Sequence, residues 1–315
     1  MPTWLITGGS GFLGRHVLKA AAGLDGVDVR TLGRRPPAGA DPRGFLAADL
    51  EQPETVARAV RLARPDVVVH AAGRTPPGSP DEFERANTRG TLHLLDALRA
   101  TARSVRVVLL GSAAELGPVP EDKLPVGETY SCRPADAYAQ SKCLATLAAL
   151  ITPRPLEVMV ARVFNPIGPG LSARQAFGRF AARLLDPTPG PMLVGDLDVR
   201  RDFVDVRDVA RAVIALAARG KGGRVYHVGT GASHGVGEGL RRLVDRSGRS
   251  IEVRVDPGRC TWAGPRDSRA DVRRILDETG WRAEVSFAAS LDDLWDEARG
   301  RTTWFELTNV QTERR

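Results

Sequence analysis

Cysteine is scarce in this chain: its 315 residues include only Cys132, Cys143 and Cys260. Their wide spacing suits neither a disulfide framework nor a metal site, so we expect reduced thiols, no metal and a cytoplasmic location. Long apolar runs are also missing, since no segment reaches the roughly 18 continuous apolar residues of a membrane span. The N-terminus lacks a basic region followed by an apolar one. The sequence therefore predicts a protein that is neither exported nor embedded in a membrane.

No block of like charge stands out either. The chain has 45 basic and 38 acidic side chains, and its net charge of +7 favours anionic ligands such as phosphates. The arginines are scattered along the sequence, which argues against nucleic-acid binding. With 42% hydrophobic and 26% charged residues, the composition is that of an ordinary globular enzyme.

A glycine-rich run, Thr7-Gly8-Gly9-Ser10-Gly11-Phe12-Leu13-Gly14, follows a short apolar segment of strand character and precedes a predicted helix over residues 12–22. This order is typical of a dinucleotide-binding turn. Gly8 would permit the tight turn, Gly11 would let the backbone approach a pyrophosphate, and Gly14 would allow close helix packing. The helix N-terminus would present free N–H groups to the phosphates.

Tyr138 and Lys142 stand four residues apart in a predicted helix over residues 137–151, and so share one face. A nearby ammonium favours the phenolate, and we expect it to lower the tyrosine pKa from its usual value of roughly 10. Such a phenol can donate and accept a proton near neutral pH. A solvated helix face is the alternative, but the upstream glycine turn favours catalysis.

Strand-like and helix-like segments alternate through the first half of the chain. Continuous apolar strands such as residues 67–69 and 107–110 indicate a parallel sheet that helices cover on both faces. We predict an α/β fold, with a doubly wound parallel Rossmann sheet over residues 1–165, a smaller C-terminal α/β substrate-binding lobe over 166–300 and a tail over 301–315. Some segments of the lobe are expected to return to the main sheet. The predicted elements are 27–32, 56–62, 67–71, 88–100, 105–110, 137–151 and 156–163, then helices at 172–185, 206–218, 236–247, 272–279 and 290–298.

These motifs together resemble those of the extended short-chain dehydrogenases/reductases, of the NAD-dependent epimerase/dehydratase type that acts on sugars. Further motifs in family order cover nearly the whole chain. They are Asp49-Leu50, which in the family lies at the adenine, His70-Ala71-Ala72-Gly73, Asn87-Thr88-Arg89-Gly90-Thr91, Gly111-Ser112-Ala113-Ala114-Glu115-Leu116-Gly117 and Arg162-Val163-Phe164-Asn165. Within the family the likeness is greatest to reductases of GDP-4-keto-6-deoxymannose, through residues 194–198, 201–208, 226–231 and 256–259.

The resemblance implies a role for each catalytic residue. Tyr138 would give its proton to a substrate carbonyl as the nicotinamide delivers hydride, Ser112 would hydrogen bond the same oxygen, and Lys142 would hold the nicotinamide ribose. Asn87 completes the catalytic set, with a hydrogen-bonded helix asparagine as the alternative, and His70 is expected to position backbone near the cofactor. The implied cofactor-binding residues are Gly8, Gly11, Phe12, Leu13, Gly14, Arg34, Arg35, Asp49, Leu50, Ala71, Ala72, Gly73, Tyr138 and Lys142.

One departure from the family pattern follows Ser112. Dehydratases that resemble this chain carry an acid pair at the positions of Ala113 and Ala114. Glu115 comes one position late, and a shift of one residue at a strand end changes the direction of the side chain. Elimination of water is therefore not expected, which leaves reduction or epimerisation.

Arg34 and Arg35 end the second predicted strand, where an acidic residue would bind the adenosine ribose hydroxyls. Two guanidinium groups suit a 2′-phosphate, although two solvated arginines are the alternative. In the family, reductases often take NADPH and epimerases commonly keep NAD. NADPH is therefore the predicted cofactor, with NADH left open.

Sugar-nucleotide enzymes of this kind usually clamp the diphosphate with two arginines. Arg201 matches the first, but Thr261-Trp262 replaces the Arg-Pro motif of the second, so Arg259 or Arg266 would have to serve. The expected substrate-binding residues are Ser112, Ala113, Asn165, Arg201 and Arg259.

The predicted function is NAD(P)H-dependent reduction of a keto group on a sugar, first of all a nucleotide-linked 4-keto-6-deoxy sugar. Two alternatives stay open: a reductase of an aminoglycoside or other secondary-metabolite keto-sugar without a nucleotide, as in antibiotic biosynthesis, and an NAD-dependent sugar epimerase. A non-catalytic NADP-binding redox sensor is disfavoured, because such relatives usually lack the Tyr/Lys pair.

The resemblance also implies a homodimer, built from the two predicted helices over residues 88–100 and 137–151 as a four-helix bundle. Leu92, Leu95, Leu147 and Leu150 form an apolar stripe on these helices. A stripe that faces the protein's own core explains the same residues equally well.

Overall fold

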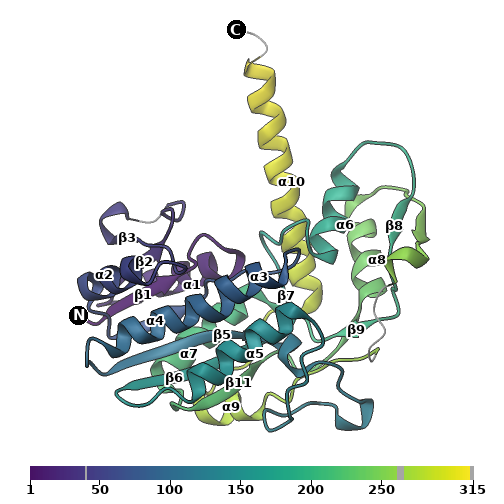
Figure 1. Cartoon of the computed structure of the whole chain (residues 1–315). Coiled ribbons are helices and arrows are strands. Elements are labelled where there is room, and N and C mark those ends of the chain that lie inside the picture. Colours follow the sequence, from purple (N-terminus) through teal and green to yellow (C-terminus); the bar gives the residue numbers. More distant parts are fainter. Residues whose placement is uncertain (40, 261–265, 313–315) are drawn as a thin grey trace.

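A computed structural model describes residues 1–39, 41–260 and 266–312, with residues 301–312 as backbone only. Its centre is a parallel sheet that helices cover on both faces (Figure 1). In spatial order the seven strands are β11 (Arg224–Val228), β6 (Leu156–Val163), β5 (Val105–Ser112), β4 (Val67–His70), β1 (Thr3–Thr7), β2 (Asp28–Gly33) and β3 (Phe45–Ala47). The order reverses between β1 and β4, as at the switch point of a doubly wound sheet. The predicted fold class is confirmed.

Both faces of the sheet are buried because successive strand residues enter different hydrophobic clusters. In β1, Trp4 and Ile6 belong to one cluster and Leu5 belongs to the other. This arrangement explains why the strands have continuous apolar sequences. The first cluster is covered by α1 (Phe12–Ala22), α7 (Val206–Arg219) and α9 (Arg273–Thr279), and the second by α2 (Pro53–Ala63), α4 (Gly90–Arg99) and α5 (Ala137–Leu150).

A second, smaller group of elements lies beside the carboxyl ends of the strands (Figure 1). Its core gathers Phe177, Phe203 and Phe287, whose rings pack on one another. The helices are α6 (Ala176–Leu185), α8 (Val236–Ser247) and α10 (Phe287–Thr312), and the strands pair as β7 (Pro166–Ile167) with β10 (Val204–Asp205), β9 (Arg200–Arg201) with β12 (His234–Gly235), and β8 (Met192–Val194) with β13 (Val253–Val255).

The helix predicted over residues 88–100 begins much earlier than expected. A short helix, α3 (Pro80–Phe83), leads into a π-helical turn over Glu84–Arg89 and then into α4. Ser79 and Glu82 form a capping box at its start, and Pro80 takes the first helical position. This capping signal is legible in the sequence, and the prediction missed it.

Other elements add to the predicted pattern, among them β3, β11 and α10. Strand β3 was not predicted, because three residues give no periodicity. Strand β11 is the part of the second half that joins the main sheet, beside β6. Helix α10 contains the predicted helix over 290–298 and continues into the residues expected to be a tail. None of the helices described here is both long enough and apolar enough to span a bilayer.

Candidate active site

The glycine turn is built as the sequence predicts. Gly8 has φ of +71°, and a Cβ at this position would lie 2.5 Å from the amide nitrogen of Ala72. A Cβ on Gly14 would lie 1.9 Å from the carbonyl oxygen of Gly8, so only glycine lets α1 pack so closely on the turn. Gly11 is the N-cap of α1. The free N–H groups of the helix therefore lie at the carboxyl ends of the neighbouring strands β1 and β4.

A cavity of ≈ 630 Å³ opens over this turn. It lies at the carboxyl ends of β1, β2, β3 and β4 and collects most of the predicted cofactor residues. They are Gly8, Gly11, Arg34, Arg35, Asp49, Leu50, Ala71, Ala72 and Gly73, and the cavity also takes in Ser10, Glu51 and Ala86, which the sequence interpretation did not include.

Phe12 and Leu13 are not among the residues that line this cavity, and their place at the cofactor stays a prediction. Phe12 packs on the hydrophobic cluster of the smaller lobe, and Leu13 packs on the cluster between α1 and α7. Because α1 begins directly after its N-cap Gly11, the side chains of Phe12 and Leu13 lie on two helix faces, each covered by a different hydrophobic cluster. Gly14 likewise serves helix packing and does not line the cavity.

His70, at the end of β4, is fully enclosed and held on both ring nitrogens. Nδ1 lies 2.7 Å from the hydroxyl of Thr7, and Nε2 lies 3.0 Å from the hydroxyl of Thr91. Thr91 donates to the carbonyl of Asn87, so the Thr91 oxygen accepts from Nε2–H, and Nδ1 accepts from Thr7. Burial lowers the pKa of His70 to about 3, and the charge of Lys142 contributes. His70 is thus neutral and ties β1 to β4 beside the glycine turn.

Asn87 lies in the π-helical turn, and its amide is occupied within the protein. The side-chain oxygen accepts from Arg74 N at 2.7 Å, while the nitrogen donates to Arg74 O at 3.0 Å and to Ser141 Oγ at 2.9 Å. Asn87 does not line the cavity that contains Tyr138. The geometry supports the alternative of a hydrogen-bonded helix asparagine, which here links the 73–74 loop to α5.

Ser112 and Tyr138 meet in a second cavity, of ≈ 470 Å³. Ser112 ends β5, and Tyr138 lies in the first turn of α5, where Asp136 caps the helix by accepting from Ala139 N at 2.8 Å. Both residues line this cavity, and the Ser112 hydroxyl lowers the pKa of the Tyr138 phenol. The predicted serine–tyrosine pair therefore comes together, from segments far apart in the sequence.

The predicted direction of the Tyr138 pKa was wrong. Burial raises the pKa of this phenol, the hydrogen bond from Ser112 lowers it, and the charges of Glu115 and Asp136 raise it further. Desolvation of the phenolate outweighs the one interaction that favours it. The free protein therefore holds Tyr138 as the neutral phenol, which is the form that can donate a proton.

Lys142 is buried one turn further along α5, and its Nζ donates to the carbonyl of Leu110 at 2.6 Å. Burial lowers the pKa of this ammonium, and the charge of Glu115 raises it in part. Lys142 is not among the residues that line the two cavities described. Its contact with a ribose stays a prediction.

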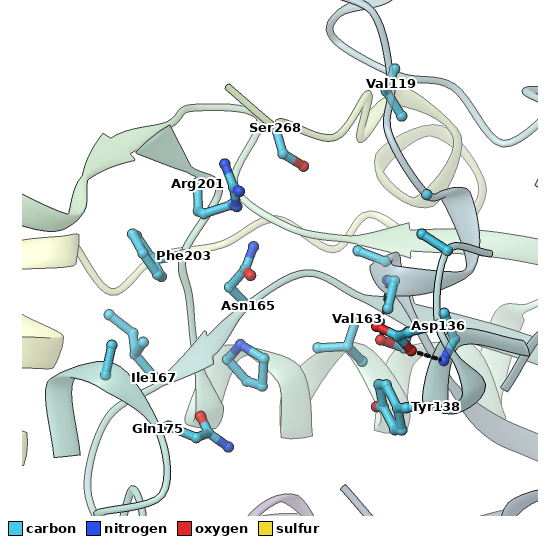
Figure 2. Close-up of a pocket in the computed structure, with 18 of the residues that line it drawn as sticks. Val119, Asp136, Tyr138, Val163, Asn165, Ile167, Gln175, Arg201, Phe203 and Ser268 are labelled. Carbon is cyan, nitrogen blue, oxygen red and sulfur yellow. Dashed lines mark hydrogen bonds between the residues drawn. The ribbon is translucent and has the colours of Figure 1, made fainter. Parts of the chain in front are cut away.

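The wall opposite Tyr138 carries the predicted substrate residues. Figure 2 shows Asn165, Arg201 and Phe203 across the cavity from Tyr138, with Gln175, the N-cap residue of α6, and Ser268 also at its edge. Asn165 is held by its amide nitrogen, which donates to Asp202 O at 3.0 Å. Gln175, Asp267 and Ser268 were not predicted, because no local motif singles them out.

Ala113 and Ala114 line the cavity beside Ser112, as predicted. Glu115 does not line it. Its carboxylate is fully buried and lies against Arg162 of β6 at 2.9 Å. The one-residue shift from the dehydratase pattern thus turns the acid away from the substrate side.

A third cavity adjoins the second, and the two share Ala176 and Arg201. Arg259 lines this third cavity and not the one with Tyr138. Burial lowers the pKa of the Arg201 guanidinium, while the nearby carboxylates of Asp267 and Asp196 raise it. The side chain of Arg266 lies 3.4 Å from Asp198. Thr261 and Trp262, the site of the missing Arg-Pro motif, lie outside the described residues.

Within the parts of the chain that the structure describes, no group of three or more His, Cys, Asp or Glu side chains is arranged to hold a metal ion. All three cysteines are free thiols.

Comparison with known proteins gives consistent matches. The sequence profile of the NAD dependent epimerase/dehydratase family matches residues 4–229. The chain is 33% identical to GDP-6-deoxy-D-mannose reductase of Pseudomonas aeruginosa over 91% of its own length and 93% of the relative. It is 30% identical to dTDP-6-deoxy-L-talose 4-dehydrogenase (NAD(P)(+)) of Kitasatospora kifunensis, over 92% and 93%. The solved structure of RMD from P. aeruginosa complexed with NADPH superposes with a TM-score of 0.83 at 30% identity, covering 96% of this chain and 100% of that one.

Proposed function

Because the chain belongs to the NAD dependent epimerase/dehydratase family, we propose that it is an NADPH-dependent reductase of the keto group of a nucleotide-linked 4-keto-6-deoxy sugar. The observation that carries this proposal is the composition of the Tyr138 cavity. A proton donor pair, Ser112 and Tyr138, faces it, while Ala113 and Ala114 stand where an elimination would need acids. Such a site can protonate a carbonyl oxygen but offers no second acid at these positions for a leaving hydroxyl.

The residues fit a dinucleotide. The cavity over the glycine turn has ≈ 630 Å³, and only glycine fits at position 8 of its floor, because a Cβ there would clash with the backbone of Ala71 and Ala72. When bound, the cofactor supplies the hydride. The neutral phenol of Tyr138 gives its proton to the substrate oxygen, and the Ser112 hydroxyl holds that oxygen by a hydrogen bond. Lys142 is proposed to contact the nicotinamide ribose.

The preference for NADPH is argued from the end of β2. Arg34 and Arg35 are exposed there and line the cofactor cavity, and no carboxylate follows the strand directly. Guanidinium groups bind phosphate by charge-assisted hydrogen bonds. The solved structure of RMD, with which this chain superposes, is a complex with NADPH.

The nucleotide part of the substrate is argued from Arg201. This residue lines both the Tyr138 cavity and the adjoining one, where Gly195, Leu197 and Arg259 also lie. A nucleoside diphosphate sugar that fills both cavities would place its diphosphate between them. A guanidinium whose pKa is lowered by burial gains from an anion at that point.

The decisive assay follows NADPH absorbance with GDP-4-keto-6-deoxy-D-mannose. Oxidation of NADPH with formation of GDP-6-deoxymannose supports the reductase. Conversion of UDP-glucose to UDP-galactose without net NADPH use would instead identify an epimerase, and turnover only with a nucleotide-free keto-sugar would reject the nucleotide-linked substrate.

A binding experiment separates the nucleotide from the chemistry. With NADPH already present, GDP should raise the melting temperature, since a ligand at a hundredfold excess over its Kd stabilises the folded state by roughly 2.7 kcal/mol. Arg201→Ala should remove that shift. Arg43→Ala is the control, because Arg43 is an exposed arginine paired with Asp41 away from both cavities. The absence of a shift with GDP, UDP and dTDP in the wild type would count against a nucleotide.

We also propose that the protein is a cytoplasmic homodimer. Leu144 and Leu147 on α5 and Leu92 on α4 are exposed, with exposed fractions of 52%, 53% and 39%. The predicted stripe was only partly correct, because Leu95 is buried in the core and Leu150 packs against it. Light scattering should give twice the monomer mass, and Leu147→Glu should give the monomer.

A further inference from the structure

A buried ion pair lies directly behind the catalytic serine. Glu115 belongs to the 3-10 turn Ala113–Leu116 that follows β5, and its Oε1 accepts the backbone N–H of Ser112 at 2.7 Å. Its Oε2 accepts from Nε and Nη2 of Arg162 at 3.0 and 2.9 Å. The two side chains are 0% and 3% exposed. The pair therefore connects the end of β5 to the end of β6 beneath the Tyr138 cavity.

Stability alone is a weak reason for such a pair. Two charges removed from water lose hydration that their mutual attraction often does not recover, and apolar replacements are frequently as stable. What a two-pronged Arg–carboxylate contact does supply is a fixed geometry. Here the fixed object is the peptide N–H of Ser112, a residue that lines the same cavity as Tyr138.

We propose that Glu115 and Arg162 are positioning residues of the reductase, which hold the Ser112 backbone so that the Ser112 hydroxyl faces the phenol of Tyr138 and the substrate oxygen. The catalytic consequence rests on the proposed function, whereas the positioning itself is a property of the folded chain.

The end of β5 is shaped around the Glu115 carboxylate. A Cβ on Gly111 would lie 2.7 Å from Glu115 Oε1 and 2.9 Å from Cγ1 of Val160. Glycine before the catalytic serine is thus required by the carboxylate behind the strand. This observation is independent of the hydrogen bonds and points to the same centre.

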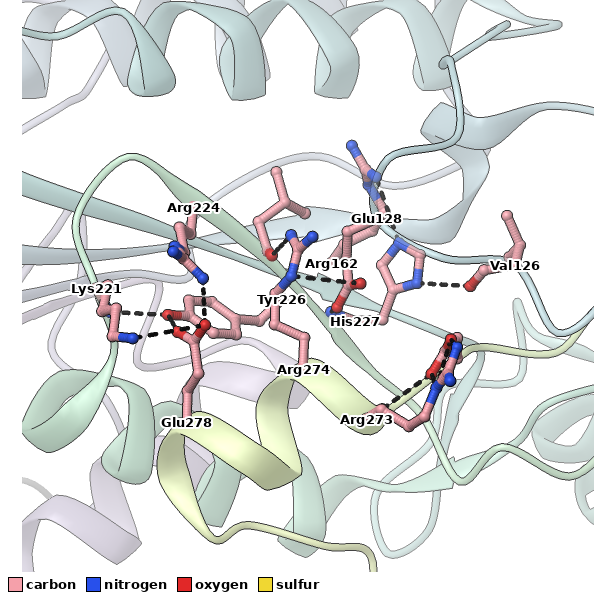
Figure 3. Close-up of polar contacts among 12 residues, drawn as sticks. Val126, Glu128, Arg162, Lys221, Arg224, Tyr226, His227, Arg273, Arg274 and Glu278 are labelled. Carbon is pink, nitrogen blue, oxygen red and sulfur yellow. Dashed lines mark hydrogen bonds and ion pairs between the residues drawn. The ribbon is translucent and has the colours of Figure 1, made fainter.

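Arg162 extends the contact to the loop that closes the cavity. Its Nη1 lies 3.4 Å from Nε2 of His227, and Nδ1 of His227 lies 3.1 Å from the carbonyl of Val126 (Figure 3). A carbonyl can only accept and a guanidinium can only donate, so His227 is neutral with its proton on Nδ1. Arg162 Nη2 also donates to Sγ of Cys132 at 3.2 Å. Val126 and Cys132 belong to the 117–136 segment, whose two ends line the Tyr138 cavity.

Glu115 also acts on the catalytic groups through its charge. Its carboxylate raises the pKa of the Tyr138 phenol and that of the Lys142 ammonium. Both effects favour the protonated forms, a neutral tyrosine and a charged lysine. Loss of the charge should therefore change the pH profile, which a purely structural residue would leave unchanged.

The test compares Glu115→Gln with a matched control on α9. Glu278→Gln also neutralises a largely buried glutamate, one that binds Arg224 and accepts from the Tyr226 hydroxyl at 2.6 Å (Figure 3). E115Q should lower kcat by about ten- to a hundredfold and leave KM for NADPH little changed. It should also shift the alkaline limb of the pH profile to lower pH. E278Q should lower the melting temperature and leave kcat and the pH profile unchanged.

A double-mutant cycle with Ser112→Ala tests whether Glu115 acts through the serine. In the S112A background, E115Q should cost less than about threefold in kcat, because the group that it positions is already gone. Full additivity of the two losses would overturn the proposal, and so would an equal loss of kcat in E278Q. Where E115Q does not fold, Arg162→Lys keeps the charge but not the two-pronged contact, and it should give the same non-additive pattern at smaller amplitude.

A readout without substrate separates this proposal from the function. The Ser112 amide proton, bonded to a carboxylate, should resonate downfield in the NMR spectrum and move upfield in E115Q but not in E278Q. An unmoved Ser112 amide in E115Q would reject the positioning role. Failure of the wild type to reduce any nucleotide-linked keto-sugar would reject the proposed function and leave the result at Ser112 to stand.

Discussion

The cofactor cavity and the Tyr138 cavity are built in opposite ways. The first is made from the ends of adjacent strands, in stretches such as residues 8–11, 33–35 and 71–73, and five of its lining residues are glycines. The second joins shorter stretches that lie far apart between Ser112 and Ser268, from strands, helices and loops. The first is therefore encoded by short motifs and the second by tertiary packing.

The two cavities also place their charges differently. Arg34 and Arg35 are exposed at the rim of the cofactor cavity, where water screens them. Glu115 and Arg162 are enclosed behind the Tyr138 cavity. Charge near the first should mainly decide which dinucleotide binds, whereas charge near the second should mainly decide how the reaction proceeds.

Tyr138→Phe tests this division with the largest expected effect. The phenol is the proposed proton donor, so kcat should fall by about 10²- to 10⁴-fold, while the ring should keep its edge contact with Phe83 and NADPH affinity should be retained. Steady-state kinetics and NADPH fluorescence titration measure the two quantities. A loss of kcat below about tenfold would remove Tyr138 from the mechanism.

The converse test replaces Arg34 and Arg35 together by alanine. Loss of charge-assisted contacts should weaken NADPH binding by about 10- to 100-fold, on the order of 1.5–3 kcal/mol, and hardly affect NADH. Saturating NADPH should restore the wild-type kcat. Equal weakening of both cofactors in a titration would show that these arginines do not bind the 2′-phosphate.

Gly14→Ala asks how strictly the glycine turn fixes the first cavity. The new Cβ would meet the carbonyl of Gly8 at 1.9 Å, so we expect a loss of about 1–3 kcal/mol in the free energy of unfolding and weaker cofactor binding. Gly127→Ala is the control, since a Cβ there meets nothing within 4 Å. Urea unfolding measures the free energy of unfolding of both variants. Equal stability of the two would contradict the prediction.

The smallest effect concerns the two enclosed histidines, His70 at the cofactor side and His227 behind the Tyr138 cavity. The pKa of each is lowered to about 3, mainly by burial, with a smaller contribution from the charge of Lys142 at His70 and of Arg162 at His227. Because each folded-state pKa lies below the unfolded value of roughly 6.5, the stabilising contribution is complete above pH 6.5 and is lost as the pH falls toward 3. His227→Asn should reduce the pH dependence of unfolding between pH 4 and 6.5 by up to about one proton. An unchanged slope would indicate that His227 is protonated in the native state.

The glycine turn, the alternating elements and the pairing of a serine with a tyrosine could all be predicted, because each depends on local spacing or on a family motif. The packing of the Phe12 and Leu13 side chains against two different cores could not be predicted, because a motif gives the position of a residue in the chain and not the core that covers its side chain. The start of the 88–100 helix was missed although Ser79 and Glu82 marked it. Nothing local marks Gln175 or Ser268, which reach the cavity only through the packing of the smaller lobe.

The sequence by itself determined the doubly wound sheet and the glycine turn under the first cavity, since strand periodicity and glycine geometry are local properties of the chain. Only the tertiary structure decided the state of Tyr138, whose pKa is raised because burial outweighs the one interaction that favours its charge. The tertiary structure also decided that the Glu115 carboxylate lies against Arg162 and not in the Tyr138 cavity. Desolvation and side-chain direction depend on what surrounds a residue in space, and neighbours such as Arg162 lie far from Glu115 along the chain.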